Sequence, residues 1–401
     1  MFGTIQTTLR DICLPMSSYP KTPIQQLDLL SLTNAQAQPE SRAPLADKEE
    51  ATADGNNANN LAYETKMISL NETRSIVGIN SSTVTHIAFL KVHKAGSTTI
   101  QNMLFRFGIK KDLNIILSKK GNQLWSKAEE LPIRKGQHYD IFALHTIYNK
   151  KFFDSLLPAN HVKIGIIREP LSRMISAAYY HRDVFHVAYL RRVPRANYIH
   201  NLVNFPEKYD RLLFSKTRNT MARDFGFSGH WNQTEIKTYL EELNSQFLFV
   251  LLMEKFDESL VYLRRLLNWS VSDILYIKTN LHKHPPVVLN GKEQEKFRKT
   301  NVYDFYVYNY FSKVFDKKLK QAPSDFWQEV TYFKKLVQEV SFLCGHSKVT
   351  QSAAPVLSVK ETKFNGHFEV TSADCAMMKT PELSFIEKLR RRHRRRQNLA
   401  S

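Results

Sequence analysis

The stretch FLKVHKAGSTTI, residues 89–100, places cationic and hydroxyl side chains directly after an apolar run. Lys91 and Lys94 supply positive charge, and Gly96 lets a ligand approach the backbone closely. If a helix begins just beyond this glycine, its free N–H groups and its dipole attract an anion. The sequence therefore predicts a phosphate-binding loop made of Lys91, Lys94, Ala95, Gly96, Ser97, Thr98 and Thr99.

The loop differs from the Walker A motif, which requires G-x-x-x-x-G-K-[ST]. Here both lysines precede Gly96, and an earlier glycine in the required position is missing. ATP is therefore a disfavoured ligand. Ser97 alone would fit a simple helix N-cap, but that interpretation leaves the two lysines and the other hydroxyls unexplained.

A second stretch, IGIIREPLSRMISAAYY at residues 164–180, has the same strand-to-helix character. An apolar run ends at Arg168, Pro170 suits the first turn of a helix, and Ser176 lies further along that helix. An arginine at the carboxyl end of a strand lies where open α/β sheets bind ligands, and its guanidinium suits a phosphate. Together the two stretches predict a nucleotide that carries phosphates at two separate places.

The elements that position these residues alternate along the chain. Apolar runs predict strands at 85–92, 140–145, 162–168, 246–253 and 273–278. Helical patterns lie at 97–107, 170–181, 234–244, 255–267 and, with an aromatic core stripe, within 291–345. This alternation predicts an α/β fold of three layers, α/β/α, with a mostly parallel sheet covered on both faces.

The same blocks resemble a known family. A lysine–hydroxyl loop followed by strand-Arg-x-Pro and a serine is similar to the two nucleotide elements of sulfotransferases. Three segments resemble the galactose 3-O-sulfotransferase family: FLKVHKAGSTTIQNMLFRFG, IIREP and FLFVLLMEKFDESLVYLRRLLNW. The resemblance extends over residues 84–345. Ala95-Gly96 departs from the Thr-Ala that is common in that family.

The resemblance implies a P-loop-NTPase-like sulfotransferase fold and 3′-phosphoadenosine 5′-phosphosulfate (PAPS) as the sulfate donor. It implies transfer to the 3-hydroxyl of a terminal β-galactose on a glycolipid of the galactosylceramide type or on a glycan. It also implies a Golgi membrane location, although the sequence presents no segment of membrane-spanning length and no apolar signal-peptide core. Oligomeric state is not assigned by the sequence.

Sulfuryl transfer needs a base for the acceptor hydroxyl and cations for the leaving phosphate. We assign Lys94 to the leaving-group side, with Lys91 in support. His145 is the favoured base and His93 is its rival. Metal-ligand spacing among His, Cys and Asp is not recognisable, and the reaction requires no metal. The run Tyr179, Tyr180, His181 and Arg182 is a candidate for the acceptor cleft.

Two short matches to protein kinase motifs, HRD at 181–183 and DFG at 224–226, are interpreted as coincidence. The position five residues after Asp183 is Ala188, where a kinase requires asparagine. The glycine-rich loop of kinases is also missing from the sequence.

The chain is predicted to divide into a stem or linker at 1–82, a sulfotransferase domain at 83–350 and a polar, basic tail at 351–401. The formal net charge of +19 owes seven charges to the run KLRRRHRRR at 388–396, interpreted as a solvated tail. The positive charge keeps two alternatives open, a glycosaminoglycan O-sulfotransferase and a catalytically inactive binding protein with this fold. A nucleic-acid partner is not expected.

Cysteine and asparagine residues bear on the compartment. Cys344 and Cys375 are able to pair where conditions are oxidising, and three cysteines are too few for a disulfide scaffold. Sequons begin at Asn71, Asn80, Asn232 and Asn268, which permits glycosylation of a secretory protein.

Overall fold

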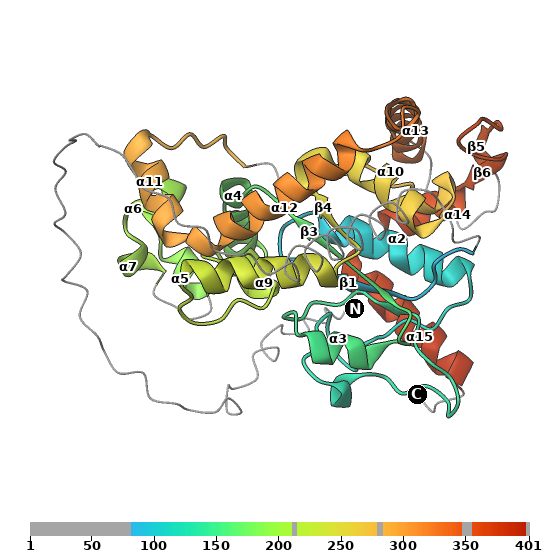
Figure 1. Ribbon diagram of the computed structural model, residues 1–401, viewed down its shortest axis with the longest axis horizontal. Helices are drawn as coiled ribbons and strands as arrows, with labels where there is room; N and C mark the ends of the chain where they lie inside the picture. The colour runs from blue at the N-terminus through green and yellow to red at the C-terminus, as the bar shows by residue number, and fades with distance from the viewer. Residues whose placement is uncertain (1–81, 211–214, 279–283, 347–354, 398–401) are drawn as a thin grey trace, which may run out of the picture. The chain divides into compact units, whose positions relative to one another are not determined.

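The computed structural model describes residues 82–210, 215–278, 284–346 and 355–397. Its centre is a four-stranded sheet in the order β2–β1–β3–β4, with every neighbouring pair parallel. Figure 1 labels β1, β3 and β4 among the helices that surround the sheet. The strands are β1 (Ile87–Leu90), β2 (Ile141–Phe142), β3 (Val162–Ile167) and β4 (Phe249–Leu252). Their residues are almost all buried, as expected for a parallel sheet covered on both faces. The predicted α/β class is confirmed.

The path of the chain creates a switch point in this sheet. From β1 the chain passes through α2 (Ser97–Lys110) to β2 on one side. From β3 it passes through α4 (Pro170–Asp183) and α9 (Gln233–Gln246) to β4 on the other side. Ligands of open α/β sheets bind at the carboxyl ends of strands where the connections diverge in this way. The carboxyl ends of β1 and β3 are therefore the expected binding edge.

Pro170 opens α4 as predicted, and Glu169 caps it by accepting hydrogen bonds from the N–H groups of Leu171 and Ser172. The helix is anchored from within by the fully buried Arg173. This guanidinium lies 3.2 Å from the Asp304 carboxylate and donates to the carbonyl of Thr217.

Smaller helices connect these elements. Along the chain, η1 (Lys127–Glu129) precedes β2 and α3 (Lys150–Leu156) follows it. Four helices come between α4 and α9 in sequence: α5 (Ala188–Arg191), α6 (Tyr198–Asn204), α7 (Pro206–Tyr209) and α8 (Thr220–Asp224).

The chain after β4 is helical as far as residue 346. It forms η2 (Met253–Lys255), α10 (Phe256–Leu267), η3 (Val271–Ile274), α11 (Gly291–Thr300), α12 (Val302–Lys320) and α13 (Phe326–His346). The aromatic stripe of α12 is core as predicted, because Phe311 and Phe315 are buried and stack on Phe225 and Phe249.

The predicted strand at 273–278 is wrong. Ser270 and Asp273 form a capping box that turns this segment into η3, and the chain then continues without pairing to the sheet. Leu275 and Tyr276 are nevertheless buried. An apolar run records burial, and burial against helices has the same sequence signature as burial in a sheet.

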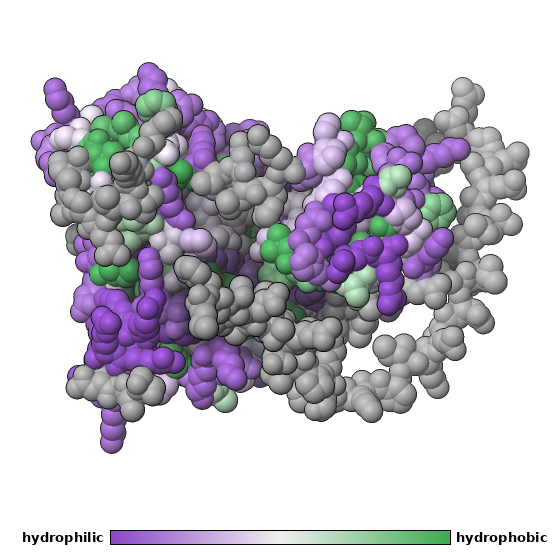
Figure 2. Space-filling view, turned by 180° about the vertical axis from the view of Figure 1, so that it is seen from behind, coloured by the Kyte–Doolittle hydropathy of each residue, from purple (hydrophilic) through white to green (hydrophobic). Residues whose placement is uncertain are grey.

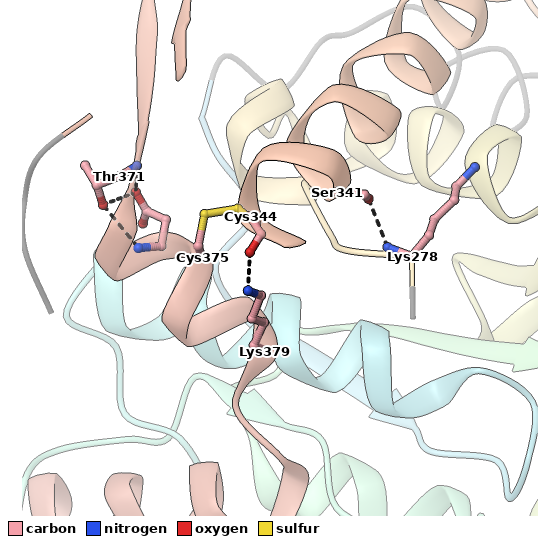
Figure 3. Close-up of a disulfide and its surroundings, with 7 residues drawn as sticks. Lys278, Ser341, Cys344, Thr371, Cys375 and Lys379 are labelled. Carbon is pink, nitrogen blue, oxygen red and sulfur yellow. Dashed lines mark hydrogen bonds between the residues drawn. A yellow bond between two sulfur atoms is a disulfide. The ribbon is translucent and has the colours of Figure 1, made fainter. Parts of the chain in front are cut away.

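The C-terminal segment is folded rather than solvated. It contains a β-hairpin of β5 (Pro355–Val359) and β6 (Phe368–Thr371), then α14 (Ser372–Lys379) and α15 (Glu382–Gln397). Cys344 at the end of α13 forms a disulfide with Cys375 in α14, and Lys379 donates to the carbonyl of Cys344 (Figure 3).

The basic run 388–396 lies on α15, and several of its cations contact the protein itself. Arg390 is buried and donates to the carbonyl of Ser118, while Arg392 and Arg396 pair with Asp112. The interpretation of this run as a solvated tail is therefore wrong for residues 388–396. Residues 1–81, which hold most of the predicted stem and two sequons, lie outside the described residues.

Hydrophilic residues cover most of the described surface in one view, and apolar residues form small separate groups there (Figure 2). Among the described residues, every helix is too short or too polar to cross a bilayer.

Candidate active site

The predicted phosphate loop occupies the carboxyl end of β1. Lys94 and Gly96 both have positive φ, at 60° and 77°, and Gly96 caps the start of α2. Left-handed residues in such a turn aim backbone N–H groups inward, as in anion-binding nests, and α2 adds its N-terminal N–H groups. A Cβ on Gly96 would meet the Met253 side chain, and the positive φ of Gly96 would strain any other residue at this position.

The loop hydroxyls differ in their surroundings. Ser97 is buried and donates to the carbonyl of Val92 at 2.6 Å, which braces the turn and replaces the predicted alternative of an N-cap. Thr98 is exposed and donates to a carboxylate oxygen of Glu382 at 2.9 Å. Ala95 is buried beneath the loop, and Thr99 donates its N–H to the carbonyl of Gly96.

Lys91 connects the loop to the rest of the site. Its buried ammonium lies 3.0 Å from His145 Nε2, 3.2 Å from Glu382 and 3.4 Å from Thr98 Oγ1. Three protons of an ammonium suffice for these three acceptors. Burial lowers the pKa of Lys91, and the Glu382 carboxylate counteracts that shift. Lys91 therefore holds the loop, His145 and Glu382 together beneath the surface of the site.

Lys94 is the more accessible cation. Its Nζ lies 3.6 Å from the centre of the Tyr180 ring, and its carbonyl accepts a hydrogen bond from Arg168 at 3.1 Å. Burial lowers the pKa of Lys94 to about 8, with further contributions from Arg168 and Lys91. An ammonium held with a lowered pKa beside two other cations is poised to accept an anion.

Arg168 joins the two predicted nucleotide elements. It follows β3, and its bond to the Lys94 carbonyl brings the second stretch against the first loop. Ser176 lies half-buried on α4, further along the same element. The two stretches that the sequence separates by more than 60 residues thus meet at the switch point between β1 and β3.

The two candidate bases stack on each other, with ring centres 4.0 Å apart. His145 is buried, and both of its ring nitrogens face Lys91, with Nδ1 2.9 Å from the carbonyl and Nε2 near the ammonium. Burial, followed by the charge of Lys91, moves the pKa of His145 well below its usual value.

His93 is arranged differently. Its Nδ1 lies 2.8 Å from the buried carboxylate of Asp224, which also accepts the His93 backbone N–H. The carboxylate fixes the proton on Nδ1, which leaves Nε2 as the nitrogen that can accept a proton.

The predicted acceptor cluster separates into two pairs. Tyr180 lies under Lys94, and burial, followed by Lys216 and His93, lowers the pKa of His181 to about 3. Tyr179 and Arg182 instead contact Tyr198. Of the two pairs, Tyr180 and His181 are the one that interacts with residues of the phosphate loop.

Two residues of this site were missed by sequence reasoning. Asp224 belongs to the DFG triplet that was dismissed as coincidence, and its contact with His93 spans 131 residues. Glu382 begins α15 in the segment interpreted as a tail, and it accepts from Asn122 as well as from Lys91 and Thr98. Burial would raise the pKa of Glu382, but these partners lower it. Each contact joins residues more than 100 positions apart, so the sequence around either acid gives no local signal for it.

Comparison with known proteins gives a family. The family model for galactose-3-O-sulfotransferase matches residues 26–392. The chain is 27% identical over 281 residues to galactose-3-O-sulfotransferase 2 of Mus musculus, which covers 65% of this chain and 70% of that protein. It is 27% identical over 271 residues to galactosylceramide sulfotransferase of Homo sapiens, covering 64% and 61%.

A third relative, galactose-3-O-sulfotransferase 3 of Homo sapiens, is 30% identical over 254 residues, covering 59% of this chain and 57% of that protein. The chain thus spans somewhat more than half of the length of these relatives.

Proposed function

Because the chain belongs to the galactose-3-O-sulfotransferase family, we propose that it is a carbohydrate sulfotransferase that uses PAPS as donor. The proposed acceptor is the 3-hydroxyl of a terminal β-galactose on a galactosylceramide-type glycolipid or on a glycan. The observation that supports this most directly is the meeting of the Lys94 loop and Arg168 at one edge of the sheet. That meeting offers two cationic places for one nucleotide.

The residues of this edge fit such a donor. The loop N–H groups, Lys94 and the start of α2 would hold the 5′-phosphosulfate, while Arg168 and Ser176 would hold the 3′-phosphate. PAPS supplies an activated sulfuryl group whose transfer leaves a phosphate oxygen with developing negative charge. Lys94 would stabilise that charge electrostatically, as fixed cations do in group transfer.

The geometry supports His93 better than His145 as the base that takes the acceptor proton. Both nitrogens of His145 are engaged by Lys91, whereas Asp224 orients His93 with Nε2 available. A histidine held by a carboxylate in this way is the arrangement that general bases use. His145 would instead support Lys91 and stack beneath the base.

The compartment that we propose is the Golgi lumen. The Cys344–Cys375 disulfide is consistent with an oxidising compartment. Of the sequons in the described residues, Asn232 and Asn268 are exposed at helix ends, where a glycan has room.

The test is transfer of labelled sulfate from PAPS to a panel of β-galactosides and to a desulfated glycosaminoglycan. The panel is run with wild type, His93→Ala, His145→Ala and the control His230→Ala, an exposed histidine outside the site. We expect transfer to galactosides, a fall in kcat of about 10²- to 10⁴-fold for His93→Ala, and wild-type activity for His230→Ala.

The outcomes separate the parts of the proposal. If His145→Ala loses more activity than His93→Ala, the base assignment is overturned. Preferred transfer to the glycosaminoglycan, with activity that falls steeply as salt rises, would favour the alternative polyanionic acceptor. Binding of the product nucleotide without transfer to any acceptor would indicate an inactive member of the family.

A further inference from the structure

Three side chains outside the proposed transfer site converge at the opposite end of the sheet. His86 precedes β1, and His138 and Asp140 precede β2. We infer that His86, His138 and Asp140 bind one divalent transition-metal ion of the Zn²⁺ class. The inference is independent of the proposed transferase activity, because β1 separates this cluster from the phosphate loop.

The distances match metal coordination. His86 Nδ1 and His138 Nδ1 lie 3.1 and 3.2 Å from the same oxygen, Oδ1 of Asp140. The three ligand atoms all lie within 4.8 Å of one another. A tetrahedral zinc ion with bonds of about 2.0–2.2 Å separates its ligand atoms by about 3.3–3.5 Å. Small side-chain movements are enough to reach that arrangement.

The carboxylate is held in place for this role. Asp140 is buried, and its second oxygen accepts the N–H of Asn114 at 2.7 Å, so that Oδ1 remains directed at the histidines. The Asn114 side chain also donates to the carbonyl of His138 at 2.9 Å. Hydrogen bonds that orient the ligands in this way are characteristic of protein metal sites.

The histidine next to β1 carries an unsatisfied atom. His86 Nδ1 is shielded from solvent and has no hydrogen-bond partner among the described residues, although it faces Asp140 Oδ1 at ion-pair distance. Buried polar atoms are nearly always partnered, and a metal ion bound by both His86 Nδ1 and Asp140 Oδ1 would supply that partner here. Two imidazoles and a carboxylate form a donor set that suits zinc, with one position left for water.

The ion would join the beginnings of two strands that pair over a short length. Only Ile87–Ile141 and Ala88–Phe142 are in register between β1 and β2 in the described structure, and Ile87 also donates to the carbonyl of Asp140. A metal bridge from His86 to Asp140 would hold the edge strand against β1. Its effect is on the stability of this edge rather than on sulfuryl transfer.

The experiment titrates Zn²⁺ alone into the full chain after a chelator has removed bound metal, using calorimetry and thermal unfolding. Wild type and the control His230→Ala are expected to bind one equivalent and to unfold at a higher temperature with zinc. His138→Ala is expected to bind at least about 10-fold more weakly, the size that even outer-shell partners contribute. The His138 side chain is 60% exposed, so this variant should fold normally.

Equal zinc binding by wild type and His138→Ala would overturn the inference, as would no binding by wild type. Co²⁺ offers a second measurement, because a four-coordinate ion gives strong visible absorption bands. Those bands should appear in wild type and His230→Ala and be lost in His138→Ala. If His138→Ala does not fold, His138→Gln replaces it under the same criteria.

Discussion

At the residue scale, the two loop lysines divide the work of one cationic site. Lys91 is enclosed by His145, Glu382 and Thr98, whereas Lys94 rests on the Tyr180 ring near Arg168. Sequence spacing alone does not distinguish them, because both lysines lie within four residues of the end of one strand. Their burial and partners give them different tasks.

The lowered pKa of Lys94, about 8, predicts how nucleotide affinity depends on pH. Lys94 carries its charge below this pKa and loses it as the pH rises through about 8. Calorimetric titration with 3′-phosphoadenosine 5′-phosphate should therefore show affinity falling above pH 8. Lys94→Arg keeps its charge throughout this range, since arginine titrates above about 12. The same fall in both proteins would contradict the assignment of Lys94.

At the element scale, α15 connects the C-terminal segment to the phosphate loop. Its first residue, Glu382, accepts hydrogen bonds from Lys91 and Thr98. About two turns further along the helix, Arg390 donates hydrogen bonds to the carbonyls of Ser118 and Gly121. The helix is thus part of the wall of the site. A deletion of residues 388–396 would remove buried Leu389 and Arg390, so it would affect folding rather than remove a solvated tail alone.

Glu382→Ala should destabilise the protein far more than a change elsewhere on the same helix. It leaves the buried Lys91 ammonium without its carboxylate, and removing one partner of a buried pair costs about 3–5 kcal/mol. Because the Glu382 side chain is 18% exposed, we expect about 3 kcal/mol in the free energy of unfolding by urea titration.

Glu387→Ala is the matched control on α15. Its carboxylate is 49% exposed and pairs with Arg390 at i,i+3, a contact worth under about 1 kcal/mol. Similar losses for the two variants would show that Glu382 supports the helix only, and not the Lys91 site.

At the scale of the whole molecule, the disulfide fixes the folded C-terminal segment to the domain. Cys344 and Cys375 are 31 residues apart in sequence, and their bond ties α13 to α14, which contacts α2 behind the loop. Because Glu382 of this segment contacts the loop, the disulfide should stabilise the site in oxidising compartments, where disulfides persist.

Loss of this bond should be measurable in the urea midpoint. Closing a loop of this length is worth about 3–4 kcal/mol in the chain-entropy account. Cys375→Ser should therefore unfold at lower urea than wild type and be insensitive to reductant. Cys13→Ser, which retains both paired cysteines, should behave as wild type and lose stability only when reduced. A wild-type midpoint in Cys375→Ser would contradict this role.

The sequence by itself determined the α/β class and four of the five predicted strands. It also singled out the loop and Arg168 as residues of the nucleotide site that we propose, and the structure brings these two together. These features are local, because a buried strand, a turn glycine and a helix start each leave a pattern within about ten residues. The failure at 273–278 has the same origin, since a local apolar run does not specify which neighbour buries it.

Only the tertiary structure decided which partners those residues have. Asp224 on His93, Glu382 on Lys91 and the His86–His138–Asp140 cluster each join positions 50 or more residues apart. Such contacts depend on how the strands are ordered and on where α15 packs, and side-chain chemistry alone does not encode that choice. Charge type and spacing predict what a residue can do, and the packed fold determines what it meets.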